Sequence, residues 1–255
     1  MPRANRHVLP GHVWHITHRC HKQEFLLKFA RDRKRWIHWL YETKRRYGLS
    51  VLNYAVTSNH VHLLVRDSGR QEIPASVQLA AGCVAQGYNR RKARKGAFWE
   101  DRYHATAVAT DDHLIQCLIY IDLNMVRAGA VNHPGDWHES GYSELLSKRQ
   151  RYRVLDLAAL MDLLNINDYE QLVTQRKAWV DRALAAGMGE EERDPRWTGG
   201  LAVGSYEFVE SVQLGLGYGA MNRSIVECDG SCVLREADVE YRVPRSASRV
   251  PLGKA

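Results

Sequence analysis

Two histidines separated by one apolar residue lie in residues 58–65 (SNHVHLLV), and this run constrains the fold more than any other part of the chain. Successive side chains of a β-strand point to opposite faces of a sheet. His60 and His62 are therefore predicted to share one face, while Val61 and Leu63 point into a core. Two imidazoles side by side on a strand are typical of a metal site, or of a donor pair for an anion.

The charge of the chain is unevenly divided between its two halves. Residues 1–127 hold 21 Lys and Arg against 10 Asp and Glu, whereas residues 128–255 hold 15 against 19. An excess of cations in the half that carries the histidine pair is typical of a protein that binds a polyanion. A solvated basic face is the alternative explanation for a sequence pI of about 9.2.

The composition favours a cytoplasmic protein rather than a secreted or membrane protein. No run approaches the roughly 18 apolar residues of a membrane span, and residues 1–7 lack the apolar segment of a signal peptide. The chain has five cysteines, of which only Cys228 and Cys232 are close in sequence. An odd number of mostly isolated cysteines favours a reducing compartment.

The order of predicted elements in the first half is that of a ferredoxin-like sandwich, an α+β fold with a central antiparallel sheet. Alternation of apolar and polar residues predicts strands over residues 13–19, 51–57, 58–65 and 98–108. Apolar positions at helical spacing predict helices over residues 25–47 and 74–95. His15 and His18 have opposite parity within the first strand, and a structural role is predicted for each.

Residues 111–127 are predicted to form a helix with a narrow polar stripe. The stripe consists of His113, Gln116, Tyr120, Asn124 and Arg127. The opposite side of the helix is apolar and consists of Leu114, Leu118, Ile121 and Met125. A tyrosine in such a stripe is not placed as a core residue would be, although a hydroxyl at a domain boundary remains an alternative. Asp122 falls within the apolar arc, and the pattern does not explain it.

A histidine pair, a helical tyrosine and a basic surface together fit one chemistry. Tyrosine can attack a phosphodiester and become covalently attached to DNA, which conserves the energy of the broken bond. Its ordinary pKa near 10 makes it a weak nucleophile at neutral pH. A divalent ion held by His60 and His62 would stabilise the developing charge. Asn124 lies one turn after Tyr120 and could supply an oxygen ligand. Two nitrogens and one oxygen suit Mn²⁺ better than Mg²⁺, which prefers carboxylates and water, although the abundance of Mg²⁺ could make it the working ion.

Several blocks of the first half resemble the REP-associated tyrosine transposases. The His60-Val61-His62 triplet resembles the HUH motif of single-tyrosine transposases, in which U is a bulky hydrophobic residue. Residues 10–20 (PGHVWHITHRC), 98–103 (FWEDRY) and 120–129 (YIDLNMVRAG) are similar to further blocks of that family. The resemblance covers about residues 8–145.

The resemblance implies a function and a set of site residues. It implies a metal-dependent endonuclease and strand transferase that cleaves bacterial single-stranded DNA at palindromic hairpins and leaves a 5′-phosphotyrosine. In that scheme Tyr120 is the nucleophile, His60 and His62 are metal ligands, and Asn124 is the third ligand. Classical insertion-sequence relatives have glutamine at the position of Asn124. The residues expected to contact DNA are Arg3, Arg6, Arg90, Arg91, Lys92, Arg94, Lys95, Arg102 and Arg127.

The chain is expected to consist of four parts. These are a basic arm over residues 1–10, an HUH single-tyrosine transposase domain over 11–147, a helical extension over 148–240 and a disordered tail over 241–255. Helices are predicted in the extension over residues 154–164, 168–186 and 203–216. The family includes dimers and monomers, and the extension favours a monomer.

Two other functions remain open at this point. One is a catalytically silent regulator that binds hairpin DNA, although such a protein would not need His60, His62, Tyr120 and Asn124 together. The other is a metal hydrolase that uses the histidine pair without a covalent step.

Overall fold

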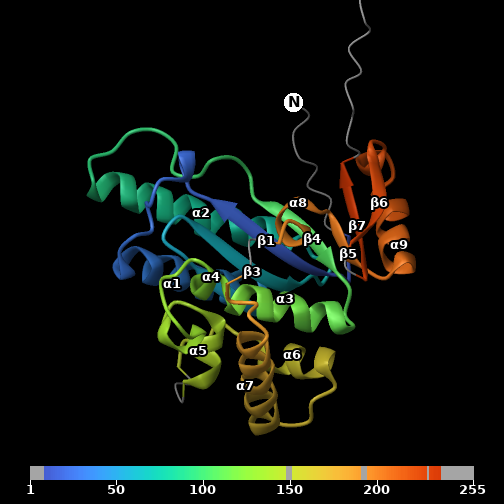
Figure 1. Ribbon diagram of the computed structural model, residues 1–255. Helices are drawn as coiled ribbons and strands as arrows, with labels where there is room; N and C mark the ends of the chain where they lie inside the picture. Colours follow the sequence, from blue (N-terminus) through green and yellow to red (C-terminus); the bar gives the residue numbers. More distant parts are fainter. Residues whose placement is uncertain (1–8, 148–150, 191–193, 229, 237–255) are drawn as a thin grey trace, which may run out of the picture.

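A computed structural model describes residues 9–147, 151–190, 194–228 and 230–236 (Figure 1). Its strands form one seven-stranded sheet in the order β2-β3-β1-β4-β5-β7-β6. The strands are β1 (Val13–Arg19), β2 (Ser50–Val56), β3 (His60–Arg66), β4 (His104–Val108), β5 (Ala202–Gly204), β6 (Arg223–Cys228) and β7 (Ser231–Glu236). The arm residues Arg3 and Arg6, the tail and the predicted boundary after residue 147 lie outside the described residues.

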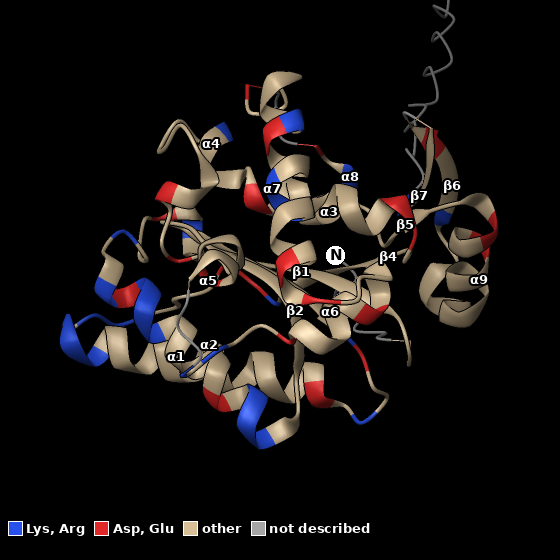
Figure 2. Cartoon of the chain, turned by 90° about the horizontal axis from the view of Figure 1, so that it is seen from below, with Lys and Arg blue, Asp and Glu red and all other residues tan. Residues whose placement is uncertain are grey.

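The first four strands and three helices confirm the predicted ferredoxin-like α+β fold. Strand β1 lies between β3 and β4 and is antiparallel to both. The helices are α1 (Ala30–Tyr47), α2 (Glu72–Arg91) and α3 (Asp112–Asp122). Figure 2 shows α1 and α2 on one side of the sheet, with α3 and α7 (Tyr169–Ala185) on the other. Odd-numbered residues of β1 and even-numbered residues of β3 therefore face α3.

Two predicted elements of the first half are shorter than expected. The helix predicted from residue 25 begins at Ala30, because the Leu27 backbone N–H donates to the Ser58 carbonyl and ties the preceding segment to the loop before β3. Phe25 and Phe29, expected on the apolar stripe, are 65% and 55% exposed. The strand predicted over residues 98–108 is regular only from His104.

The predicted helix over residues 111–127 is interrupted at Leu123, whose φ of −77° and ψ of 0° end α3. A short helix, α4 (Asn124–Arg127), follows it. Asp122 is completely buried at this interruption, where its carboxylate accepts hydrogen bonds from Arg176 of α7 at 2.5 Å and from Asn53 of β2 at 2.9 Å. The aspartate that the helical pattern left unexplained therefore fixes α7 to α3 and to the sheet.

The second half contains the predicted helices together with strands that were not predicted. Its helices are α5 (Gly141–Leu146), α6 (Leu157–Leu164), α7, α8 (Arg196–Gly199) and α9 (Tyr206–Leu216). The helix predicted from residue 203 begins only after β5, where the Ser205 side chain accepts a hydrogen bond from the Phe208 N–H. Strand β5 pairs in parallel with β4, and the β6–β7 hairpin extends the sheet. The extension was expected to be mainly α-helical, and it also adds three strands to the same sheet.

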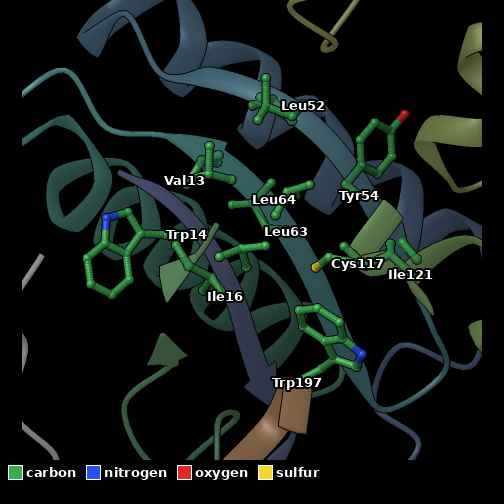
Figure 3. Packing of buried hydrophobic residues seen from close by; sticks show 14 of the residues in the cluster. Val13, Trp14, Ile16, Leu52, Tyr54, Leu63, Leu64, Cys117, Ile121 and Trp197 are labelled. Atoms are coloured by element: carbon green, nitrogen blue, oxygen red, sulfur yellow. The ribbon is translucent and has the colours of Figure 1, made fainter. Parts of the chain in front are cut away.

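Most of the buried apolar side chains form one continuous core around the sheet (Figure 3). Two tryptophans, Trp14 on β1 and Trp197 on α8, are among its largest fully buried side chains. Trp14 belongs to the face of β1 that is turned away from α3, since its parity is opposite to that of His15. Trp197 packs against α3, and Figure 3 places it next to Cys117 of that helix.

Candidate functional site

Strand β3 presents two histidines toward α3 and α4. The Nε2 atoms of His60 and His62 lie 3.0 Å apart. The Asn124 side-chain amide donates to His62 Nε2 at 2.9 Å. The structure therefore brings together the three residues that the sequence analysis selected as metal ligands.

The hydrogen bonds of His60 indicate which of its ring nitrogens carries the proton. Its Nδ1 lies 2.7 Å from the Asn59 side-chain oxygen and 3.0 Å from Thr57 Oγ1. The Thr57 hydroxyl donates to the His60 carbonyl, so its oxygen is an acceptor for the ring. Because two acceptors face Nδ1, the proton is assigned there, and the lone pair on Nε2 is directed at His62.

His15 is a site residue that the sequence analysis missed. Its ring is stacked on that of His62 at 5.1 Å, and its Nε2 lies 2.9 Å from His62 Nδ1. With the Nδ1 proton of His62 donated to His15, the lone pair of His62 remains on Nε2. The signal was present in the sequence, because β1 is a neighbour of β3 in the predicted fold and His15 has the parity of the face toward α3.

All three histidines are held neutral by burial. Desolvation lowers the pKa of His15 to about 3 and that of His60 to about 4. It lowers the pKa of His62 well below the ordinary value, with the neighbouring His60 adding to the effect. A neutral imidazole keeps the lone pair that binds a metal ion.

The donor set fits a divalent cation. Two neutral nitrogens direct lone pairs at one another across 3.0 Å, an arrangement that a positive charge between them would stabilise. Within the described part of the chain no three His, Cys, Asp or Glu residues cluster around a metal-sized site. Asn124 contacts His62 Nε2 through its amide, and turning the amide so that oxygen replaces nitrogen would give it an oxygen ligand for the same ion.

Tyr120 lies beside the histidines and, contrary to the sequence analysis, it is buried, with 5% of its surface exposed. Of the predicted polar stripe, Gln116 is exposed, whereas Tyr120 and Asn124 face the histidines. The phenol ring lies edge-on to His62 at 5.8 Å and to His15 at 5.9 Å. Burial raises the pKa of Tyr120 to about 12, so its hydroxyl is fully protonated at neutral pH.

Arg127 moderates this effect from the short helix α4. Its guanidinium carbon lies 4.4 Å above the Tyr120 ring, and Nη2 donates to the Tyr120 backbone carbonyl at 2.5 Å. Arg127 lowers the pKa of Tyr120, and Arg19 on β1 acts in the same direction. The structure thus places one of the predicted DNA-binding arginines directly at the phenol.

The other predicted DNA contacts within the described residues lie in two further places. Arg102 lines a polar pocket of about 270 Å³ beside β1, together with Arg19 and Thr198. The cluster at the end of α2 consists of Arg90, Arg91, Lys92, Arg94 and Lys95. It lies on the α1–α2 side, where Figure 2 shows many of the Lys and Arg residues. There Arg91 forms an ion pair with Asp32 of α1.

Comparisons with known proteins find one family model and similar solved structures. Residues 10–124 match the family model described as "Transposase IS200 like". One similar solved structure is a REP-associated tyrosine transposase bound to a REP hairpin, with 18% sequence identity and a TM-score of 0.49. That match covers 58% of this chain and 87% of the other.

A second similar structure is a protein of Deinococcus radiodurans R1 provisionally described as a transposase. It is 20% identical, with a TM-score of 0.33 and coverage of 48% of this chain and 95% of that chain. None of the curated proteins compared with the chain matches it. Among the described residues, none of the helices has the length and apolar character needed to cross a bilayer. Residues 10–124, which are similar to the IS200-like transposase family model, include β1, the His60–His62 pair, Tyr120 and Asn124.

Proposed function

We propose that this protein cleaves and joins single-stranded DNA through a covalent link to Tyr120. The convergence of the His60–His62 pair, the Asn124 amide and the Tyr120 phenol in one buried site carries the proposal. The phenol oxygen attacks the phosphorus of a phosphodiester and the phenol proton is released. The bond from phosphorus to the 3′ oxygen breaks, which leaves a 5′-phosphotyrosine and a free 3′-hydroxyl. Attack by a 3′-hydroxyl reverses the step and joins strands.

Each neighbour of the phenol has a defined part in this scheme. His60, His62 and Asn124 would hold a divalent ion, Mg²⁺ or Mn²⁺, which when bound stabilises negative charge on the scissile phosphate. His15 fixes the tautomer of His62 through the 2.9 Å contact. Arg127 favours the phenolate and adds positive charge where the phosphate must approach.

We further propose that the substrate is a single-stranded hairpin and that the protein acts as a monomer in the cytoplasm. The excess of Lys and Arg in residues 1–127 supports a DNA substrate. The catalytic domain would comprise residues 11–147, with the arm, including Arg3 and Arg6, and the cluster at the end of α2 as additional DNA contacts. Residues 148–240 would form the extension.

The decisive experiment compares wild type with Tyr120→Phe. Wild-type protein, mixed with single-stranded hairpin DNA from the flanks of its own gene, should form an adduct that survives denaturing electrophoresis with Mn²⁺ or Mg²⁺ and not with EDTA. Tyr120→Phe should form no adduct and cleave no DNA. Its DNA affinity should stay within about twofold, because the Tyr120 hydroxyl has no hydrogen-bond partner among the described residues.

Two outcomes of this experiment would support other functions. If Tyr120→Phe cleaves as well as wild type, the protein is a metal hydrolase that needs no covalent intermediate. If wild type binds the hairpin tightly but forms neither adduct nor cleavage product with either ion, it is a DNA-binding regulator.

A second prediction concerns His15. We expect His15→Phe to weaken Mn²⁺ binding by about 10–100-fold, since His62 loses the partner that fixes its tautomer and ring orientation. Isothermal titration with Mn²⁺ measures the effect directly and does not depend on cleavage. His18→Phe is the matched control, because His18 lies on the same strand, is 7% exposed and stacks on Trp99 on the other face. Equal Mn²⁺ affinities of the two variants would contradict the assignment.

A further inference from the structure

The segment around α8 lies outside the residues that match the family model, yet it forms one wall of the site. It lies beside β4, where the Gly200 carbonyl accepts hydrogen bonds from Thr106 Oγ1 at 2.6 Å and His104 Nε2 at 2.8 Å. The next carbonyl, that of Leu201, accepts from the Ala107 N–H at 2.8 Å. These bonds fix the position of the segment relative to β4 and the site.

Trp197 is the side chain by which this segment reaches the phenol. It is 2% exposed, and its ring centroid lies 6.0 Å from that of Tyr120 with an interplanar angle of 34°. Figure 3 shows the indole next to Cys117, one turn before Tyr120 on α3. Trp197 is therefore a fixed part of the core rather than a surface side chain that folds over the site.

The phenol ring is held by packing and not by hydrogen bonding. Among the described residues the Tyr120 hydroxyl has no hydrogen-bond partner. Its ring is contacted by His15 and His62 at the edge, by Arg127 from above and by Trp197. Of these four, Trp197 alone comes from the extension, and its indole is the largest apolar group among them.

We infer that Trp197 is a positioning residue, which holds the Tyr120 ring in reach of the His60–His62 pair. This inference rests on the proposed function and extends it, because it makes the extension a part of the catalytic site. Loss of a close packing partner lets a ring with no hydrogen bond at its hydroxyl take other orientations. A nucleophile displaced by about 1 Å can lose roughly 100-fold in rate without any change in substrate binding.

The test uses the full chain with Trp197→Ala and Trp197→Phe. We expect Trp197→Ala to lower the single-turnover rate of adduct formation at saturating DNA by about 10–100-fold. The DNA concentration for half-saturation should stay within about threefold of wild type, and Trp197→Phe should restore most of the rate. Rates are measured well below the unfolding temperature of each variant and are normalised to the folded fraction.

Trp14→Ala is the matched control. Trp14 is also 2% exposed in the same core, but it lies on the face of β1 turned away from Tyr120. Both Ala variants should lose comparable stability, since each removes a fully buried indole, and only Trp197→Ala should lose rate. An equal loss of rate in Trp197→Ala and Trp14→Ala would mean that Trp197 only stabilises the fold and does not position Tyr120. A faster reaction of Trp197→Ala would mean that the segment restrains the phenol, which also overturns the inference.

A second measurement does not depend on DNA cleavage, and it therefore tests this inference separately from the proposed function. The chain is labelled with 3-fluorotyrosine, and among its 12 tyrosines the ¹⁹F resonance of Tyr120 is assigned by its loss in Tyr120→Phe. Trp197→Ala should shift and broaden this resonance, whereas Trp14→Ala should not. An unchanged resonance overturns the positioning role even if adduct forms. Absence of adduct in wild type overturns the proposed function whatever the spectrum shows.

Discussion

Replacement of Asp122 by alanine is expected to lower the free energy of unfolding by about 3–5 kcal/mol, because it leaves a buried guanidinium without its carboxylate. The ion pair of Asp122 with Arg176 is 2.5 Å long, and the two side chains are 0% and 2% exposed. The second carboxylate oxygen accepts from Asn53 at 2.9 Å, so the same substitution removes a further buried hydrogen bond. Urea unfolding of wild type and Asp122→Ala in EDTA measures the difference.

Two further variants decide whether this cost comes from the buried charge. Arg66→Ala removes an ion pair with Asp162 whose side chains are 42% and 71% exposed, and it should cost less than about 1 kcal/mol. The double variant Asp122→Leu/Arg176→Leu should be more stable than Asp122→Ala, because no unpaired charge remains. If Asp122→Ala costs no more than Arg66→Ala, the pair is not what attaches α7 to α3.

The histidine strand and the tyrosine helix could be predicted from sequence because their signals are local. Parity along residues 60–66 is sufficient to place His60 and His62 on one face, and helical spacing brings Asn124 near Tyr120. The helix is interrupted at Leu123, but Asn124 still lies at the site, since its amide donates to His62. The fold class follows from the same local patterns and their order along the chain.

The features that could not be predicted depend on partners far away in sequence. Asp122 looked misplaced on its helix because its partner, Arg176, lies 54 residues later. Tyr120 was assigned to a polar stripe and not to the core, whereas Trp197 and the histidine face of the sheet bury it. Strand β5 was missed because it has only three residues, and it is stabilised by pairing with β4 and β7, which lie far away in sequence.

Acid should destabilise the metal-free protein steeply between pH 6.5 and pH 5, because several histidines are buried in the neutral form. Burial lowers the pKa of His15 to about 3 and the pKa values of His18 and His60 to about 4. In the unfolded chain each titrates near pH 6.5. Below that pH the unfolded state therefore binds more protons than the folded state, and the free energy of unfolding falls as the pH falls.

The expected size of this effect is large compared with the stability of a protein domain. At pH 5 each of these three histidines is about 1.5 pH units below its unfolded pKa, which corresponds to a loss of roughly 2 kcal/mol for each. Their sum of roughly 6 kcal/mol is comparable to the whole stability of many domains. Urea unfolding in EDTA at pH 7, 6 and 5 gives the profile.

A single variant tests the origin of the acid effect away from the proposed metal ligands. His18 is buried on the α2 side of the sheet, where its Nε2 donates to the Asp101 carbonyl at 2.9 Å. His18→Gln should make the dependence of the unfolding free energy on pH shallower by about 1.4 kcal/mol per pH unit near pH 5.5. The exposed His38→Gln on α1 is the control. A flat profile for wild type would mean that the buried histidines are charged in the folded protein, and a charged His60 or His62 could not bind a metal ion.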